Sequence, residues 1–349
     1  MNKLKQTLSN FGWPRLMIGS FLVLLFIVGS FVGVSPVMSL NDVINRFGMC
    51  GIMVLSMVPM IQSGCGLNFG IPVGLVAGLF GAVLSLEFQL TGLPGILAAM
   101  AMAAVLALIL GFGYGTLLNK VKGDEMIIAT YVGYAIVYLM NIFWIALPFR
   151  NPSSVQGFKG EGLRSTISVE NYWGGTFSRF LQIPINRHLT IPVGMLLFFA
   201  LMCFLVWLFF KTKTGTAITA VGSNPEYARA AGININKMRT ISVMLSTMLA
   251  ALGIIMYQQS FGFIQLYNAP LSFSFPSVSA ILLGGASTNK ASIPNVVVGT
   301  LLFQGILTMA PSVINSAIAI DASDVLRIII TYGLILYALT RKEKGEQHA

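Results

Sequence analysis

The chain has 349 residues, of which 56% are hydrophobic and 9% are charged, and its formal net charge is +10. A soluble domain carries roughly 25% charged residues, so this composition excludes a water-soluble globular protein and predicts an integral membrane protein. The basic balance would fit nucleic-acid binding, but we favour the excess of Lys and Arg that membrane proteins carry in cytosolic loops, and we expect no nucleic-acid partner.

Apolar segments long enough to cross a bilayer, roughly 20 residues, recur along the whole chain. They predict an all-α polytopic membrane protein with about ten transmembrane segments, including broken or re-entrant helices. The apolar stretch behind Lys3, Lys5 and Arg15 is longer than the core of a signal peptide, so we expect it to be retained as the first span. In chain order, the expected spans are residues 16–35, 47–64, 71–88, 95–118, 126–148, 189–210, 240–258, 276–285 (broken), 293–310 and 325–340.

Lysine and arginine gather in alternate connections between these spans, which predicts that the N- and C-termini are both cytosolic. On that topology the chain is a single transmembrane domain of residues 1–349. Residues 149–188 form a turn-rich extracytoplasmic loop and residues 211–239 form a cytosolic loop. Tyr172 and Trp173 in the long loop are expected at the membrane interface, with contact to a partner as the alternative.

The sequence holds none of the motifs that would indicate an enzyme. It has no G-x-x-x-x-G-K-[ST] phosphate loop, no H-E-x-x-H and no G-x-S-x-G. Cys50, Cys65 and Cys203 are too widely spaced for a metal site or a disulfide framework. We therefore expect no catalytic residue and no bound metal or cofactor. No charged residue lies clearly at mid-membrane, so the ion relay of a secondary transporter is not expected either.

Two segments interrupt helical regularity, residues 62–72 and residues 270–285. Interrupted apolar segments in both halves of a chain indicate a translocation pathway, because irregular backbone at membrane depth needs surrounding protein or a water-filled cavity. The alternative is packing, since polar side chains also tie helices together and glycines such as Gly74 and Gly78 let them approach. The candidate pathway residues are Gln62, Asn68, Phe69, Tyr131, Tyr134, Phe275, Ser277 and Ser279.

The cytosolic loop contains one short polar helix between two apolar blocks. Asn224 is a favourable N-cap, Pro225 suits the first helical position, and Glu226 suits the positive end of the helix dipole. Three alanines, Ala228 among them, leave a slender surface, and Gly232 suits the left-handed position that ends a helix. Such a helix suits insertion into a groove of a partner protein, and an ordinary loop helix is the alternative.

The same region carries a family resemblance. Residues 215–233 resemble the cytosolic coupling loop of ABC importer permeases of the ribose, simple-sugar, nucleoside and branched-chain amino acid group. Residues 66–70, Gly-Leu-Asn-Phe-Gly, resemble that group's broken-helix motif, although sugar members usually carry Asp-Leu-Ser there and this chain lacks the aspartate. Residues 122–127 are similar to the stretch that opens a span in the nucleoside-type permeases.

The resemblance implies half of an import pore, paired with a second permease subunit that is identical or related. Two ATP-hydrolysing ABC subunits would hold ATP and Mg²⁺ and dock on the coupling helix, so this chain would not itself be an enzyme. An extracytoplasmic solute-binding protein would deliver a nucleoside or simple sugar at the bacterial cytoplasmic (inner) membrane. The alternatives are a branched-chain amino acid importer permease and an ion-coupled secondary transporter. The residues expected at the ATPase contact are Gly222, Asn224, Pro225, Glu226, Ala228, Arg229, Ala231 and Gly232.

Overall fold

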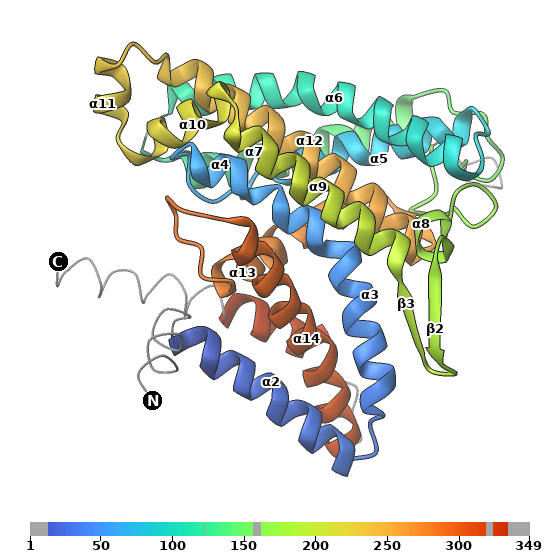
Figure 1. Cartoon of the computed structure of the whole chain (residues 1–349). Helices are drawn as coiled ribbons and strands as arrows, with labels where there is room; N and C mark the ends of the chain where they lie inside the picture. Colours follow the sequence, from blue (N-terminus) through green and yellow to red (C-terminus); the bar gives the residue numbers. More distant parts are fainter. Residues whose placement is uncertain (1–12, 122, 156–161, 319–323, 334–349) are drawn as a thin grey trace.

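A computed structural model describes residues 13–121, 123–155, 162–318 and 324–333 of the chain (Figure 1). Most of these residues are helical, which confirms the helical prediction, and the few short strands form two two-stranded sheets. Within the described residues, six helices are long and apolar enough to cross a membrane, and three shorter apolar helices accompany them. The expected total of about ten segments stays a prediction. So does the cytosolic location of both termini.

The described chain begins with helix α2 (Trp13–Phe31), followed after a turn by α3 (Pro36–Leu55) and α4 (Met57–Gln62). The second expected span, residues 47–64, is wrong at its start, because the helix already begins at Pro36. Proline suits the first turn of a helix, where the missing N–H has no partner to lose. The polar residues that follow it hid this start, although α3 and α4 together make one apolar span of 27 residues.

Helix α12 (Ile235–Phe261) lies at the centre of the molecule (Figure 1). It packs on α5 (Pro72–Glu87), α6 (Gly92–Lys120) and α3, while α7 (Glu125–Ala146) lies against α5 and α9 (Val193–Lys211) lies against α3. About two-thirds of the most apolar part of α12 is buried, compared with less than a quarter for α7 and α9. The chain therefore has a protein-covered central helix and two outer helices with broad apolar faces.

Two glycines of α5 allow it to lie directly on α12. A Cβ added at Gly74 would come within 2.4 Å of the carbonyl oxygen of Thr247, and one at Gly78 would come within 2.2 Å of the Ile254 side chain. Real Cβ atoms do not approach other atoms this closely, so only glycine fits. The interpretation of these two glycines as packing residues is confirmed.

The described residues of the loop between α7 and α9 contain more regular structure than the many turn residues indicated. Strand β1 (Thr166–Ser168) pairs antiparallel with β4 (Phe263–Gln265), which follows α12. After the single-turn helix α8 (Thr176–Arg179), strands β2 (Gln182–Asn186) and β3 (Leu189–Pro192) form a hairpin. The loop is thus tied to the far end of the central helix by backbone hydrogen bonds.

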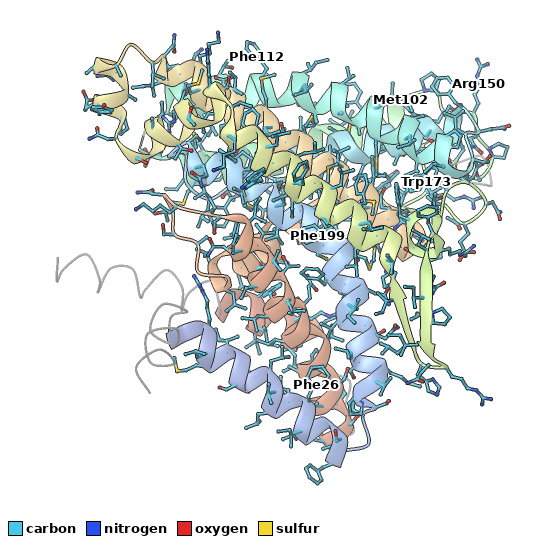
Figure 2. The ribbon with its side chains drawn as sticks, viewed as in Figure 1. Phe26, Met102, Phe112, Arg150, Trp173 and Phe199 are labelled. Atoms are coloured by element: carbon cyan, nitrogen blue, oxygen red, sulfur yellow. The ribbon has the colours of Figure 1, made fainter. Side chains whose placement is uncertain are left out.

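Two expectations for this loop are wrong. The sixth expected span, residues 189–210, loses its first four residues to β3, and the helix begins at Val193, directly after Pro192. The β-branched Thr190 and Ile191 suit a strand, and hydropathy alone does not separate such a run from a helix. Trp173 is not interfacial, because its side chain is buried inside the molecule (Figure 2).

The second interrupted segment, residues 270–285, is irregular only at its two ends, because residues 274–283 form a regular helix. The 3-10 helix η1 (Ala269–Phe273) leads directly into α13 (Ser274–Leu283), and a non-helical connection then leads to α14 (Ile293–Ile318). Pro276 lies in the first turn of α13, where proline is tolerated, so the break comes after this helix and not at the proline. Residues 324–333 are helical, and the rest of the last expected span lies outside the described residues.

The elements separate into two ends of the molecule. Helices α10 (Lys213–Ser223) and α11 (Pro225–Ala230) and the α13–α14 connection lie at one end, here called the α11 end (Figure 1). Helix α8 and the β2–β3 hairpin lie at the opposite end. Between them, large apolar side chains such as Phe112 stand on the outside of the helices, whereas Phe199 lies inside (Figure 2). Outer faces of this kind suit lipid or another membrane subunit.

Candidate functional site

The polar helix of the α11 end has the predicted cap and stop. The side-chain oxygen of Asn224 accepts a hydrogen bond from the backbone N–H of Tyr227 at 3.0 Å, and Pro225 occupies the first turn. Gly232 has a φ of +77°, and the N–H beyond it, of Ile233, donates to the Ala228 carbonyl at 2.9 Å. These bonds satisfy backbone groups at both helix ends, so α11 is confirmed as a short helix held by local chemistry.

Helix α11 exposes one face and anchors the other. Ala228 is fully buried, so its expected place on the surface is wrong: it is the one buried residue of this six-residue helix. Glu226 and Arg229 form an exposed ion pair at 3.3 Å, which contributes at most about 1 kcal/mol. The face available to a partner therefore includes Tyr227 and Ala231 together with this charge pair.

Gly222 joins the coupling segment to the first interrupted segment. A Cβ added there would come within 2.1 Å of the Gln62 carbonyl oxygen and 2.9 Å of the Gly64 nitrogen, so two backbones cross at this point. The Gln62 side chain strengthens the crossing, because Thr219 of α10 donates to its oxygen at 3.4 Å and its amide donates to the carbonyl of Ala291. Gln62 thus links α4, α10 and the α13–α14 connection.

Asn68 lies at the centre of the first interrupted segment, and it is completely buried. Its amide donates to the hydroxyl of Ser246 at 2.9 Å and its oxygen accepts from the Tyr114 hydroxyl at 3.1 Å. Ser246 in turn donates to the carbonyl of Ser56 at 2.6 Å. This network connects α3, α6 and α12 to the irregular backbone, so the Asn68 side chain satisfies buried polar groups within the core.

Asn68→Leu is expected to lower the free energy of unfolding by about 1–3 kcal/mol, because the Tyr114 and Ser246 hydroxyls would lose a partner in a buried site. Thermal unfolding of the purified protein in detergent measures this. Asn45→Leu is the control, since the Asn45 amide donates to Asn41 within its own helix. Equal losses for the two variants would contradict a structural role for Asn68.

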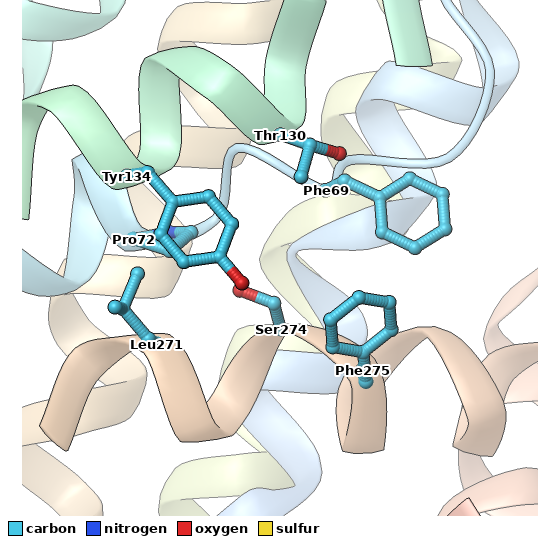
Figure 3. A pocket seen from close by; sticks show the side chains of 7 residues that line it. All are labelled: Phe69, Pro72, Thr130, Tyr134, Leu271, Ser274 and Phe275. Atoms are coloured by element: carbon cyan, nitrogen blue, oxygen red, sulfur yellow. The ribbon is translucent and has the colours of Figure 1, made fainter. Parts of the chain in front are cut away.

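Three of the candidate pathway residues meet at one small cavity (Figure 3). Phe69 and Phe275 face each other with ring centroids 5.7 Å apart, and Tyr134 closes a third side. The cavity holds about 10 Å³, which is room for roughly one water molecule. In this conformation it is therefore a constriction and not an open solute site.

The constriction also has polar lining that the sequence interpretation missed. Thr130 of α7 and Ser274 of α13 both line it, and the Tyr134 and Ser274 hydroxyls point toward each other (Figure 3). The positions of both residues in the sequence could have indicated this role. Thr130 lies one helical turn before Tyr134, and Ser274 lies beside Phe275 in the second interrupted segment.

The other candidate pathway residues lie elsewhere. Tyr131 stands on the outer face of α7 and is 68% exposed. Ser277 and Ser279 are buried in α13, and the Ser279 hydroxyl donates to the Thr331 carbonyl at 3.0 Å. Gln62 lies at the crossing of the α11 end. The structure thus brings together three of the four aromatic members of the candidate set, Phe69, Tyr134 and Phe275.

A buried ion pair lies at the α11 end, between the start of α7 and the start of α12. Arg239 in the first turns of α12 pairs with Glu125 at the start of α7, and both side chains are largely buried. The Arg239 Nε also lies 3.0 Å from the Cys65 Sγ in the first interrupted segment. The sequence predicted Arg239 to be an ordinary cation of the cytosolic loop. The residues around it in the sequence give no sign that it pairs with a carboxylate far away in the chain.

Comparisons with known proteins found one matching family and several similar relatives. Residues 39–339 match the family described as branched-chain amino acid transport system / permease component. The chain is 23% identical over 336 residues to the nucleoside ABC transporter permease protein NupB of Lactococcus lactis subsp. cremoris (strain MG1363), covering 90% of this chain and 86% of that protein. It is 24% identical over 333 residues to the ribose import permease protein RbsC of Escherichia coli (strain K12), covering 94% of each.

A third relative belongs to another import system. The chain is 25% identical over 292 residues to the autoinducer 2 import system permease protein LsrD of Yersinia enterocolitica serotype O:8 / biotype 1B (strain NCTC 13174 / 8081). That match covers 81% of this chain and 79% of that protein. The three relatives share one role, that of a permease, and differ in the solute that their names give.

Proposed function

Because this chain belongs to the family of branched-chain amino acid transport system permease components, we propose that it is the transmembrane permease subunit of an ATP-driven ABC importer. It pairs with a second permease subunit, identical or related, and two ABC ATPase subunits dock at the α11 end. An extracytoplasmic solute-binding protein delivers the solute at the opposite end, where the β2–β3 hairpin projects. The assembly lies in a bacterial cytoplasmic (inner) membrane with both termini of this chain in the cytosol.

The observation that carries this proposal is the backbone crossing of Gly222 with Gln62. Helix α11 follows α10 with only Asn224 between them, and the last turn of α10 crosses the backbone that opens the first interrupted segment. That segment leads within a few residues to Phe69 at the constriction. ATP-driven closure of the docked subunits would move α11, and the crossing would carry that displacement to the constriction, because packed backbones cannot slide independently.

We propose a nucleoside or simple sugar as the solute. The constriction presents the aromatic faces of Phe69 and Phe275 together with the hydroxyls of Tyr134, Thr130 and Ser274. Aromatic rings stack on sugar or base faces, and hydroxyls exchange hydrogen bonds with a hydroxylated solute. Among the described residues that line the constriction none is charged, which favours a neutral solute over an amino acid. The names of the nucleoside and ribose relatives support the same solute class.

The chemistry of ATP hydrolysis belongs to the partner in this proposal. ATP and Mg²⁺ bind in the ATPase subunits, and this chain binds no cofactor. This chain contributes the docking surface, because α11 offers an exposed tyrosine and a slender alanine face to a groove of the ATPase. Such a contact depends on shape complementarity more than on charge, because Glu226 and Arg229 already neutralise each other in an ion pair.

Ala231→Trp is expected to weaken ATPase binding on the order of tenfold or more, because a large side chain would replace a small one at the docking face. Co-purification of the ATPase with the variant measures this. The control is Ala146→Trp, an exposed alanine at the end of α7, which should retain the ATPase. Ala228→Trp is unsuitable, since Ala228 is buried and the substitution would disturb α11 itself.

Uptake into proteoliposomes tests the energy source. With the ATPase and the binding protein present, uptake of the solute is expected to require ATP and to ignore an imposed proton or sodium gradient. Uptake that persists without ATP and follows an ion gradient would show a secondary transporter instead and would overturn the proposal.

A further inference from the structure

We propose that a groove between the end of α6 and the start of α12 binds one anionic phospholipid. The groove has a volume of about 560 Å³ and opens on the outer surface at the α11 end. It is distinct from the constriction at Phe69, and neither the docking face of α11 nor the Gly222 crossing takes part in it.

The rim of the groove carries positive charge without a compensating acid. Lys120 ends α6 and Lys237 lies in the first turn of α12, and both are exposed. Within the described part of the chain neither lysine has an ion-pair partner, and no acidic residue is among those that line the groove. Two cations that line one groove at the ends of apolar helices favour a phosphodiester headgroup.

Polar groups below the rim match the rest of a phospholipid headgroup. Asn119 donates its amide to the Asn236 carbonyl and to the Thr240 hydroxyl, each at 2.9 Å, so its side-chain orientation is determined. The Asn119 Oδ1 is buried and accepts no hydrogen bond within the described residues. The two lysines suit a negative phosphate, and the side chains of Thr116 and Asn236, which also line the groove, can exchange hydrogen bonds with a glycerol headgroup.

The floor of the groove is apolar, and this favours a lipid over a protein as the ligand. Phe112, Ile241 and Met244 form it, and Phe112 is 57% exposed. Phe112 lies eight residues before Lys120, so the floor runs about 12 Å along α6 from the charged rim toward the middle of the helix. Exposed Ile109 and Val105 continue the same apolar surface. An acidic peptide could satisfy the lysines but would gain nothing from a floor that continues along a membrane helix, whereas acyl chains cover it.

Native mass spectrometry of the full chain in detergent tests the site by titration with dioleoyl-phosphatidylglycerol and with dioleoyl-phosphatidylcholine. The wild-type chain is expected to bind the anionic lipid at lower concentration. The double variant Lys120→Gln/Lys237→Gln should weaken that binding by about five-fold per lysine and leave phosphatidylcholine binding unchanged. Lys213→Gln, which removes one exposed charge at the same end outside the groove, is the control and should bind as wild type.

A second variant separates shape from charge. Thr116→Trp fills the groove from α6 without changing any charge and should also weaken phosphatidylglycerol binding.

The proposal is overturned if the double lysine variant binds phosphatidylglycerol like wild type, or if Lys213→Gln reduces binding equally. It is also overturned if deacylated glycerophosphoglycerol competes as well as the whole lipid, which would show an anion site alone. Displacement of the lipid by the bound ATPase would likewise overturn it, because the groove would then be a protein interface.

Discussion

Gly222→Ala is expected to reduce ATP-driven uptake about tenfold or more while the ATPase still co-purifies with the variant. The added Cβ would meet the Gln62 carbonyl oxygen at 2.1 Å and the Gly64 nitrogen at 2.9 Å. Both neighbours are backbone atoms, so neither can rotate away, and α10 must separate from the first interrupted segment. Overpacking of this kind costs about 1–3 kcal/mol. A loss of that size in the coupling between two sites corresponds to a 5- to 150-fold effect.

Gly113→Ala is the matched control for this experiment. Gly113 lies in the interior of α6 with open space around the position of a Cβ, so alanine there should leave uptake unchanged and stabilise the helix by at most about 1 kcal/mol. Uptake by the permease–ATPase complex in proteoliposomes, divided by the amount of assembled complex, is the measurement. Normal uptake by Gly222→Ala would show that the crossing does not transmit the movement of α11.

Arg239→Met is expected to lower the free energy of unfolding by about 3–5 kcal/mol, because it leaves the carboxylate of Glu125 largely buried without its cation. Glu125→Gln should have a similar effect, since it leaves the Arg239 guanidinium beside Cys65 without a countercharge. The double variant Glu125→Leu/Arg239→Met should recover most of the loss, because an apolar pair removes both desolvated charges.

The measurement is chemical or thermal unfolding of each purified variant in detergent, analysed as a double-mutant cycle. Lys237→Met is the control, since it removes an exposed cation two residues away on the same helix and should change stability by less than about 0.5 kcal/mol. If the two single variants cost no more than this control, the pair would not be a buried ion pair in solution.

The features that sequence analysis predicted correctly depend on local chemistry. The cap at Asn224 and the stop at Gly232 involve bonds within a few residues, so the order of residue types determines them. The long apolar segments likewise imply membrane helices, and the spacing of Gly74 and Gly78 implies that two of them lie in close contact. Helix starts were less accurate, since a proline start at Pro36 lies among polar residues.

The sequence by itself thus determined the class of protein, most of its helices and the short capped helix at the α11 end. Only the tertiary structure decided which polar residues meet. It buried Ala228 beneath α11, tied Asn68 into the core, and paired Arg239 with Glu125 across 114 positions of the chain. Such contacts depend on how the helices pack against one another. The periodicity of a sequence predicts which face of a helix is buried, but not which helix packs on that face.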